Sequence, residues 1–233
     1  MNFRKLLTIL AAATLGISGI AAANPILMLQ AGGTTVTIAD GQVGPPADSN
    51  PGVGAVTYIG GVGGWLTNVT TGLGSTQLGG DPHLDLNSVN VSTFPGGGSN
   101  QTLEIWFTET GFTTGLGGIA AFAGEIGGTL ASRTGNGLIE WFVYIDTANT
   151  AFGTGTLVAG DQTALSPFAQ SDAGSVLLTG PYSMTLRVRI THPDGNGIAT
   201  SFNFSAQMVP EPGTLLLLGV GLLGLALARR KVS

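Results

Sequence analysis

The chain has 233 residues, of which 39 are glycine and only 9% are charged, and it contains no cysteine. The absence of cysteine excludes a disulfide framework and a cysteine-based metal site. Hydrophobic residues make up 43% of the chain, so it can bury a core and lacks the composition of a disordered protein.

The formal net charge of −5 conceals an uneven distribution along the chain. Five of the eight basic residues lie in the two terminal segments, whereas residues 24–209 carry twelve acidic residues and three arginines, a net charge of −9. A body with this charge is repelled by phosphate backbones, so we expect no nucleic-acid partner.

The first residues have the layout of a secretory signal peptide. Arg4 and Lys5 form a positive n-region, an apolar segment follows, and Ala21 and Ala23 supply the small residues of a cleavage site. We therefore expect a signal helix over 1–23, export by a Sec-type machinery, and cleavage by signal peptidase after Ala23.

The body shows the alternation of polar and apolar side chains that is typical of strands with one face in water. The clearest case is 182–192 followed by 198–208, and we predict that these two strands form a hairpin. Further strands are predicted at 34–40, 55–60, 65–70, 84–92, 102–109, 119–126, 138–146, 155–160 and 175–180. Glycine-rich connectors separate them, so the sequence predicts an all-β body that is an antiparallel β-sandwich or jelly-roll-like.

Two of these strands place aromatic and acidic side chains on the face opposite to their apolar face. Glu104 and Trp106 share one side of one strand, and Glu140, Phe142 and Tyr144 share one side of another. This mixture is typical of a surface on which sugars stack, so the five residues are candidate glycan-binding residues. The two glutamates are also a candidate carboxylate pair for glycoside hydrolysis. The alternative is a sheet margin covered by loops.

Three residues with metal-binding side chains alternate along the chain at Asp81, His83 and Asp85. They would share one side of a strand, which makes them a candidate divalent-ion site, and the alternative is a loop that runs into a strand edge. The chain has only two histidines and no Gly-x-Ser-x-Gly motif. We expect no catalytic residue, no enzymatic activity and no cofactor.

The chain closes on Pro210, Glu211 and Pro212, followed by an uncharged, leucine-rich segment over 213–228. A helix over this segment would span roughly 24 Å, somewhat less than a ~30 Å hydrocarbon core. Three basic residues end the segment, namely Arg229, Arg230 and Lys231. Their position is that of cytoplasmic residues in a chain whose body has crossed the membrane, so we predict a C-terminal transmembrane helix in the inner membrane.

In this order, these features resemble the PEP-CTERM protein-sorting signal of Gram-negative bacteria, over residues 209–232. The resemblance implies a substrate of an exosortase, a membrane peptidase, with Pro210, Glu211 and Pro212 as recognition residues. It also implies a bacterium that makes exopolysaccharide and a biofilm or floc matrix. The alternative is a plain C-terminal membrane anchor.

The sequence thus predicts a signal peptide (1–23), an exported all-β domain (24–209) and a sorting signal (210–233). We expect a precursor anchored in the inner membrane and then a protein of the cell surface or extracellular matrix, structural or adhesive in an exopolysaccharide matrix. One alternative is a carbohydrate-binding module, assisted by calcium. The other is a secreted hydrolase.

Overall fold

The computed structural model describes residues 24–78, 82–95, 101–130, 137–193 and 197–210. The predicted signal helix with Ala21 and Ala23 lies outside these residues, and so does the predicted membrane helix over 213–228. The other predicted sorting residues that lie outside them are Glu211, Pro212, Arg229, Arg230 and Lys231. Within the described part of the chain, no helix combines the length and apolar character needed to cross a bilayer.

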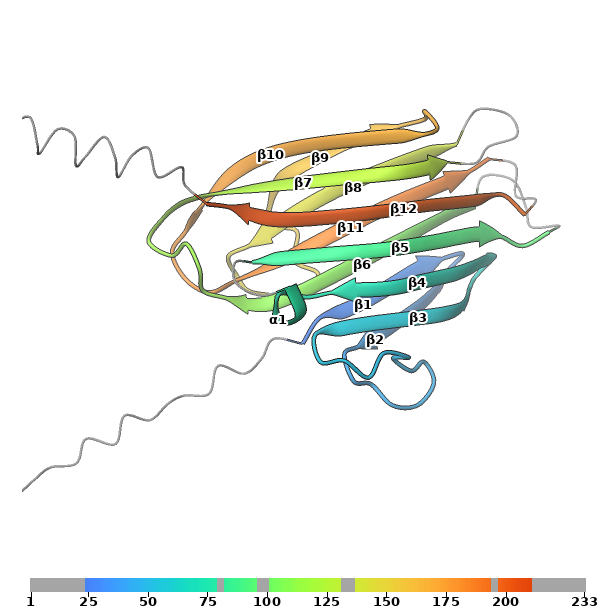
Figure 1. Cartoon of the computed structure of the whole chain (residues 1–233), viewed down its shortest axis with the longest axis horizontal. Coiled ribbons are helices and arrows are strands. Elements are labelled where there is room, and N and C mark those ends of the chain that lie inside the picture. Colours follow the sequence, from blue (N-terminus) through green and yellow to red (C-terminus); the bar gives the residue numbers. More distant parts are fainter. Residues whose placement is uncertain (1–23, 79–81, 96–100, 131–136, 194–196, 211–233) are drawn as a thin grey trace, which may run out of the picture.

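The described residues form two antiparallel sheets of six strands each, seen as two layers in Figure 1. Sheet A contains, in spatial order, β2 (Thr34–Ala39), β1 (Ile26–Ala31), β6 (Gln101–Phe112), β11 (Tyr182–His192), β8 (Leu138–Asp146) and β9 (Thr156–Thr163). Sheet B contains β10 (Phe168–Leu178), β7 (Gly118–Leu130), β12 (Ala199–Val209), β5 (His83–Thr93), β4 (Trp65–Leu73) and β3 (Ala55–Val62). A single turn of helix, α1 (Ser75–Leu78), joins β4 to β5. The prediction of an all-β body is confirmed.

Most consecutive strands from β5 to β12 lie in opposite sheets. The chain therefore builds β5-β12-β7-β10 in sheet B and β6-β11-β8-β9 in sheet A. Two facing groups of four strands connected in this way are the arrangement of a jelly roll. The hairpins β1-β2 and β3-β4 then widen sheet A and sheet B at one edge.

The predicted hairpin between 182–192 and 198–208 is wrong, although both strands exist close to the predicted bounds. Strand β11 pairs with β6 and β8 in sheet A, whereas β12 pairs with β5 and β7 in sheet B. A short connection can return the chain within one sheet or carry it across to the facing sheet. Side-chain alternation is the same in both cases, so it does not distinguish them.

Strand β1 was not predicted from the sequence, and β10 begins earlier than the predicted strand at 175–180. Strand β1 lies between β2 and β6, and it opens with four apolar residues in succession. In the structure Leu27 and Leu29 are fully buried, while Ile26 and Met28 are half-buried on the other face. A continuous apolar run of this kind hides the alternation on which the prediction depends.

The core lies between the two sheets and consists of the inward residues of the predicted strands together with Leu27 and Leu29 of β1. Strand β6 contributes Leu103, Ile105 and Phe107, and β11 contributes Leu186 and Val188, all fully buried. The other large, fully buried side chains include Trp65, Leu84, Leu86, Phe122, Trp141, Tyr182 and Phe204. The predicted apolar faces are therefore confirmed, and the polar residues between them are turned outward.

The start of β1 and the end of β12 lie toward the same end of the sandwich, beside α1 (Figure 1). The Met208 amide donates to the Pro82 carbonyl at 2.9 Å, and the Ser75 hydroxyl donates to the His83 carbonyl at 3.0 Å. Pro25 lies against Gly74, just before α1. Both ends of the body therefore meet its terminal segments at one end, and the broad sheet faces extend away from it.

Residues 24–209 should fold without the terminal segments, without a metal and without a redox partner. The two sheets cover each other's apolar faces, and the body has no cysteine. Far-UV circular dichroism of the purified fragment in EDTA should show a β spectrum and a cooperative thermal transition. A random-coil spectrum, or a β spectrum that returns only on adding calcium, would contradict the prediction.

Candidate functional site

The five predicted glycan-binding residues do come together, on the outer face of sheet A. Strand β11 lies between β6 and β8, so its residues separate the two predicted halves of the surface. One row across the three strands is Trp106, Arg187 and Phe142, and the next row is Glu104, Arg189 and Glu140. Tyr144 follows Phe142 on the same side of β8.

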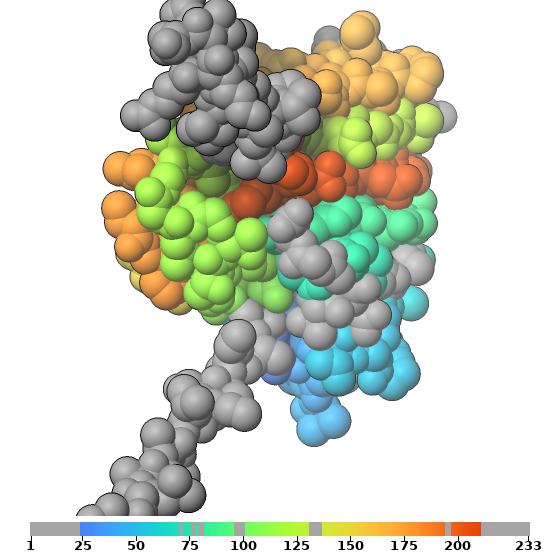
Figure 2. Space-filling model, turned by 60° about the vertical axis from the view of Figure 1, so that its left-hand side comes forward, coloured from blue at the N-terminus to red at the C-terminus, as the bar shows by residue number. Residues whose placement is uncertain are grey.

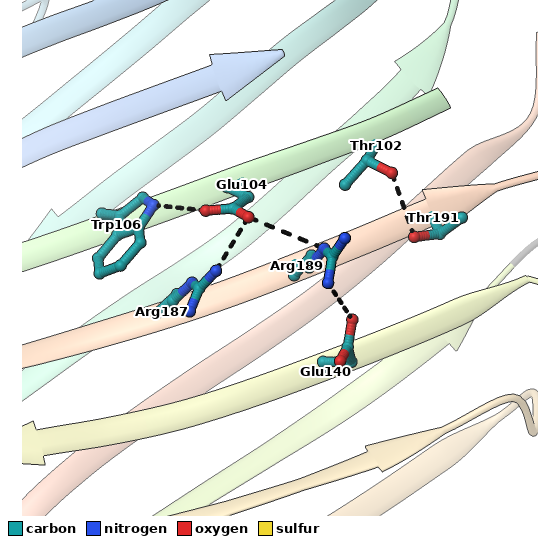
Figure 3. Close-up of polar contacts among 7 residues, drawn as sticks. All are labelled: Thr102, Glu104, Trp106, Glu140, Arg187, Arg189 and Thr191. Carbon is teal, nitrogen blue, oxygen red and sulfur yellow. Dashed lines mark hydrogen bonds and ion pairs between the residues drawn. The ribbon is translucent and has the colours of Figure 1, made fainter. Parts of the chain in front are cut away.

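The two arginines of β11 pair with the two glutamates, as Figure 3 shows. The distance from Arg187 Nη2 to Glu104 Oε1 is 2.9 Å, and Arg189 reaches Glu104 at 3.8 Å and Glu140 at 3.5 Å. The indole Nε1 of Trp106 donates to Glu104 Oε2 at 3.1 Å. Both carboxylates thus have cationic partners, which is a poor setting for a pair that must exchange protons in glycoside hydrolysis.

Arg187 also occupies the space between the aromatic rings. Its guanidinium carbon lies 4.5 Å from the Trp106 ring centroid and 5.5 Å from that of Phe142. Burial disfavours the charge of Arg187, but hydrogen bonds and charge interactions with Glu104 and Tyr144 outweigh burial and raise its pKa. The ring faces that turn toward β11 are therefore covered by a permanent cation, and stacking of a sugar there would displace it.

A second surface, the outer face of sheet B, contains a groove of about 790 Å³ that was not predicted. Strand β12 runs between β5 and β7 on this face, visible as the red strip in Figure 2. The polar residues that line the groove are His83, Asp85, Asn87, Glu125, Gln170, Ser171, Asn203, Ser205 and Gln207. We call this set, together with Ile126, Gly127 and Ala169, the sheet-B groove.

Two carboxylates of the sheet-B groove flank a hydroxyl in one row across the sheet. Ser205 of β12 lies opposite Asp85 on one side and opposite Glu125 on the other. Its hydroxyl donates to Glu125 Oε1 at 3.3 Å. Burial raises the pKa of Asp85, His83 opposes that rise, and the Glu125 carboxylate adds to it. The row is thus acidic, with one carboxyl sheltered from water and the other exposed.

The predicted metal-binding set is divided by the limits of the described residues. His83 and Asp85 lie on the same side of β5 and line the sheet-B groove, as the alternation predicted, whereas Asp81 lies outside the described residues. Among the residues that the structure describes, no three His, Asp or Glu side chains gather closely enough to hold a metal ion. The calcium-assisted alternative therefore stays a prediction.

The second histidine has a structural role. His192 ends β11 fully buried, its Nε2 lies 2.7 Å from the Thr200 hydroxyl, and its ring lies 4.5 Å from that of Trp65. These contacts join the end of sheet A to sheet B beside the crossing from β11 to β12. His192 therefore lies in the core, away from both outer faces.

The family comparison finds the PEP-CTERM protein-sorting motif at residues 209–231. The chain thus carries the sorting signal that its C-terminal sequence resembles, and the motif indicates a surface protein that is processed by an exosortase. No curated protein matches the chain, and no characterised family matches its body.

Two solved structures show low similarity to the chain. One is the N-terminal part of the endo-1,4-beta-D-xylanase 10B of Clostridium thermocellum with xylohexaose, at 10% identity and a TM-score of 0.30 over 64% of this chain. The other is the isomalto-dextranase of Arthrobacter globiformis with panose, at 14% identity and a TM-score of 0.25 over 80% of this chain. The match spans only 27% and 30% of those two proteins. At this level, the two structures support no argument about the function of this chain.

Proposed function

We propose that this chain is an exported matrix protein whose β body is structural or adhesive in an exopolysaccharide or biofilm matrix. An exosortase at the inner membrane would release or transfer the body by cleavage near Pro210, Glu211 and Pro212. The body would then act at the cell surface or outside the cell.

The observation that carries this proposal is the position of the sorting motif relative to the fold. Strand β12 ends at Val209, and the motif begins at residue 209. Cleavage beyond that point would remove no strand from either sheet, so the exported product would be a complete domain. Pro210 lies outside the strand and is exposed, which suits a junction that a peptidase must reach.

The arrangement of the two ends of the body supports the same role. Because β1 starts and β12 ends at one end of the sandwich, a membrane-held body would present both sheet faces to the surroundings. The outer face of sheet A carries the ion-paired row of Glu104, Arg189 and Glu140, which offers a structured polar contact surface. A hydrolytic function has less support, because the same pairs engage both candidate carboxylates.

Replacing Glu211 with alanine should leave the precursor uncleaved and the matrix without this protein. Glu211 is the one charged residue of the Pro210-Glu211-Pro212 motif, so its carboxylate is the group that a matching pocket of the peptidase would read. The variant should be expressed from the native locus as the only copy. The full-length chain, including the Arg229-Arg230-Lys231 peptide, should accumulate in the membrane, while the wild-type body is found in the matrix fraction by mass spectrometry.

The variant Asp172→Ala, which removes an exposed carboxylate of β10 outside both the motif and the sheet-B groove, is the control and should be processed as the wild type is. If Glu211→Ala and wild type ran at one mass with the basic peptide retained, the tail would be a plain anchor. If the wild-type body were cleaved but recovered only from the medium, the sorting signal would stand and the matrix role would be wrong.

A further inference from the structure

The sheet-B groove is hollow because two neighbouring positions in it, Gly127 and Ala169, carry nothing larger than a methyl group. In one row across the sheet, Asn203 of β12 lies opposite Gly127 of β7, and Gly127 is followed by Ala169 of β10. The row nearer the end of β12 contains Asp85, Ser205, Glu125 and Ser171, whose side chains stand above the sheet. Small residues beside longer polar ones thus form a floor and walls.

We propose that the sheet-B groove binds an uncharged polysaccharide chain. Its volume of about 790 Å³ falls within the usual range for ligand sites, roughly 300–1,000 Å³. The groove crosses β5, β12, β7 and β10, and three strand spacings of about 4.8 Å give a span of roughly 14 Å, enough for a short run of sugar units.

The chemistry of the walls matches sugar hydroxyls. The Gln207 side-chain amide donates and accepts hydrogen bonds, as a hydroxyl does, and Ser205 adds a hydroxyl of its own. The Asn203 amide offers its NH₂ group, because its oxygen already accepts from the Ser88 amide at 2.6 Å. The carboxylates of Asp85 and Glu125 can each accept hydrogen bonds from hydroxyls, and such charge-assisted bonds are the stronger ones. A polyhydroxylated ligand would satisfy donors and acceptors along the whole groove.

The same lining disfavours other polymers. It contains two carboxylates and no lysine or arginine, so a uronic acid or phosphate polymer would be repelled. In strand addition, an extended peptide pairs its backbone with a free strand edge. The centre of the groove offers no such edge, because β12 already pairs with β5 and β7 on both sides.

This site differs from the predicted surface of Trp106, Phe142 and Tyr144, which lies on the opposite side of the molecule on sheet A. The inference rests on the proposed matrix role only for the place where the ligand is encountered. Binding to a purified glycan is measured without cells, so a failure of one proposal can be told from a failure of the other.

The decisive variant is Gly127→Leu, which fills the floor without breaking a hydrogen bond. A Cβ at Gly127 would meet only the Phe168 carbonyl oxygen, at the ordinary contact distance of 3.6 Å. Leucine avoids an aromatic ring, which could stack on sugars and add affinity. The matched control is Gly118→Leu on the same strand. A Cβ at Gly118 would have nothing within 4 Å, and Gly118 is not one of the residues that line the groove.

The full-length chain in detergent should be run by affinity electrophoresis in gels that contain a neutral β-glucan, a galactomannan or dextran, with alginate as the anionic polymer. Wild type and Gly118→Leu should be retarded by at least one neutral polymer and not by alginate. Gly127→Leu should raise the dissociation constant at least tenfold. The shape-preserving double variant Asp85→Asn with Glu125→Gln should weaken binding as well, by about tenfold, because two charged acceptors are lost.

Three results would overturn the proposal: no retardation in any neutral gel, equal retardation of wild type and Gly127→Leu, or stronger retardation in alginate than in the neutral gels. Equal retardation would place glycan binding on another surface, and the Trp106→Ala variant on sheet A would then be the next to compare.

Discussion

Replacing Trp141 with alanine should destabilise the body by about 4 kcal/mol, since removal of a large aromatic side chain from a core costs roughly 3–5 kcal/mol. The Trp141 side chain is fully buried, and its ring packs edge-to-face on Phe204 of the opposite sheet, with 5.5 Å between centroids. Its Nε1 also donates to Gln170 Oε1 at 2.9 Å. One side chain of β8 thus joins sheet A to both β12 and β10 in sheet B.

The control for this variant is the next residue along the chain. Phe142 points away from the core and contacts Arg187 and Tyr144 on the outer face of sheet A. Phe142→Ala should cost about 1 kcal/mol, the size of an exposed cation–π contact. Urea unfolding of residues 24–209, followed by far-UV circular dichroism, measures both variants. Similar losses for the two would mean that Trp141 does not join the sheets as described.

Side-chain alternation predicted the strands and which residues each one buries. Leu103, Ile105 and Phe107 alternate with Glu104 and Trp106 in the sequence, and the structure buries the first group in the core and leaves the second half-buried on the outer face. This works because alternation is a local property of an extended chain with one face against a core. It also explains why β1, whose apolar residues are consecutive, was missed.

Strand order could not be predicted, because it depends on pairings between distant parts of the chain. Arg187 was expected on a wet face, but nothing local indicates that β11 inserts between β6 and β8 and brings Arg187 against Glu104, 83 positions away. The strand order thus determines which side chains lie between the predicted aromatic and acidic residues. The aromatic and acidic residues are adjacent as expected, yet the arginines between them occupy the site.

The sequence predicted only two residues of the sheet-B groove, because the others come from strands whose order could not be predicted. His83 and Asp85 were recognised as sharing one side of a strand, which the structure supports. Their partners Glu125 and Ser205 come from β7 and β12, and the sequence gives no sign that these strands are neighbours of β5. Gly127, whose small size opens the groove, looks like any other glycine in a glycine-rich chain.

Raising the pH from 5 to 8 should destabilise the wild-type body by about 2 kcal/mol more than the Glu109→Gln variant, at 1.36 kcal/mol per unit of pKa change. Glu109 is the inward-facing acidic residue of β6, with 3% of its surface exposed. Burial raises the pKa of Glu109 to about 7, the Ser75 amide that donates to its carboxylate at 2.8 Å opposes the rise, and Asp40 adds to it.

The direction follows from proton binding. Between the unfolded pKa near 4.5 and the folded pKa of about 7, the folded protein keeps a proton on Glu109 that the unfolded chain has lost. The contribution of Glu109 to the free energy of unfolding is therefore largest below that window. It falls as the pH rises through the window and stays low above about pH 7. Glutamine has no such proton and can still accept the Ser75 bond, so its stability should change less with pH.

Urea midpoints of wild type and Glu109→Gln, measured from pH 5 to pH 8, test this prediction through the difference between the two pH profiles. Absolute stability is a poorer readout, because a buried amide brings its own unpaired donors. Phe142→Ala, which removes no titratable group, is the control, and its pH profile should run parallel to that of the wild type at lower stability. Parallel profiles for wild type and Glu109→Gln would mean that Glu109 ionises in the folded body as readily as in the unfolded chain, and that water reaches its carboxylate beside α1.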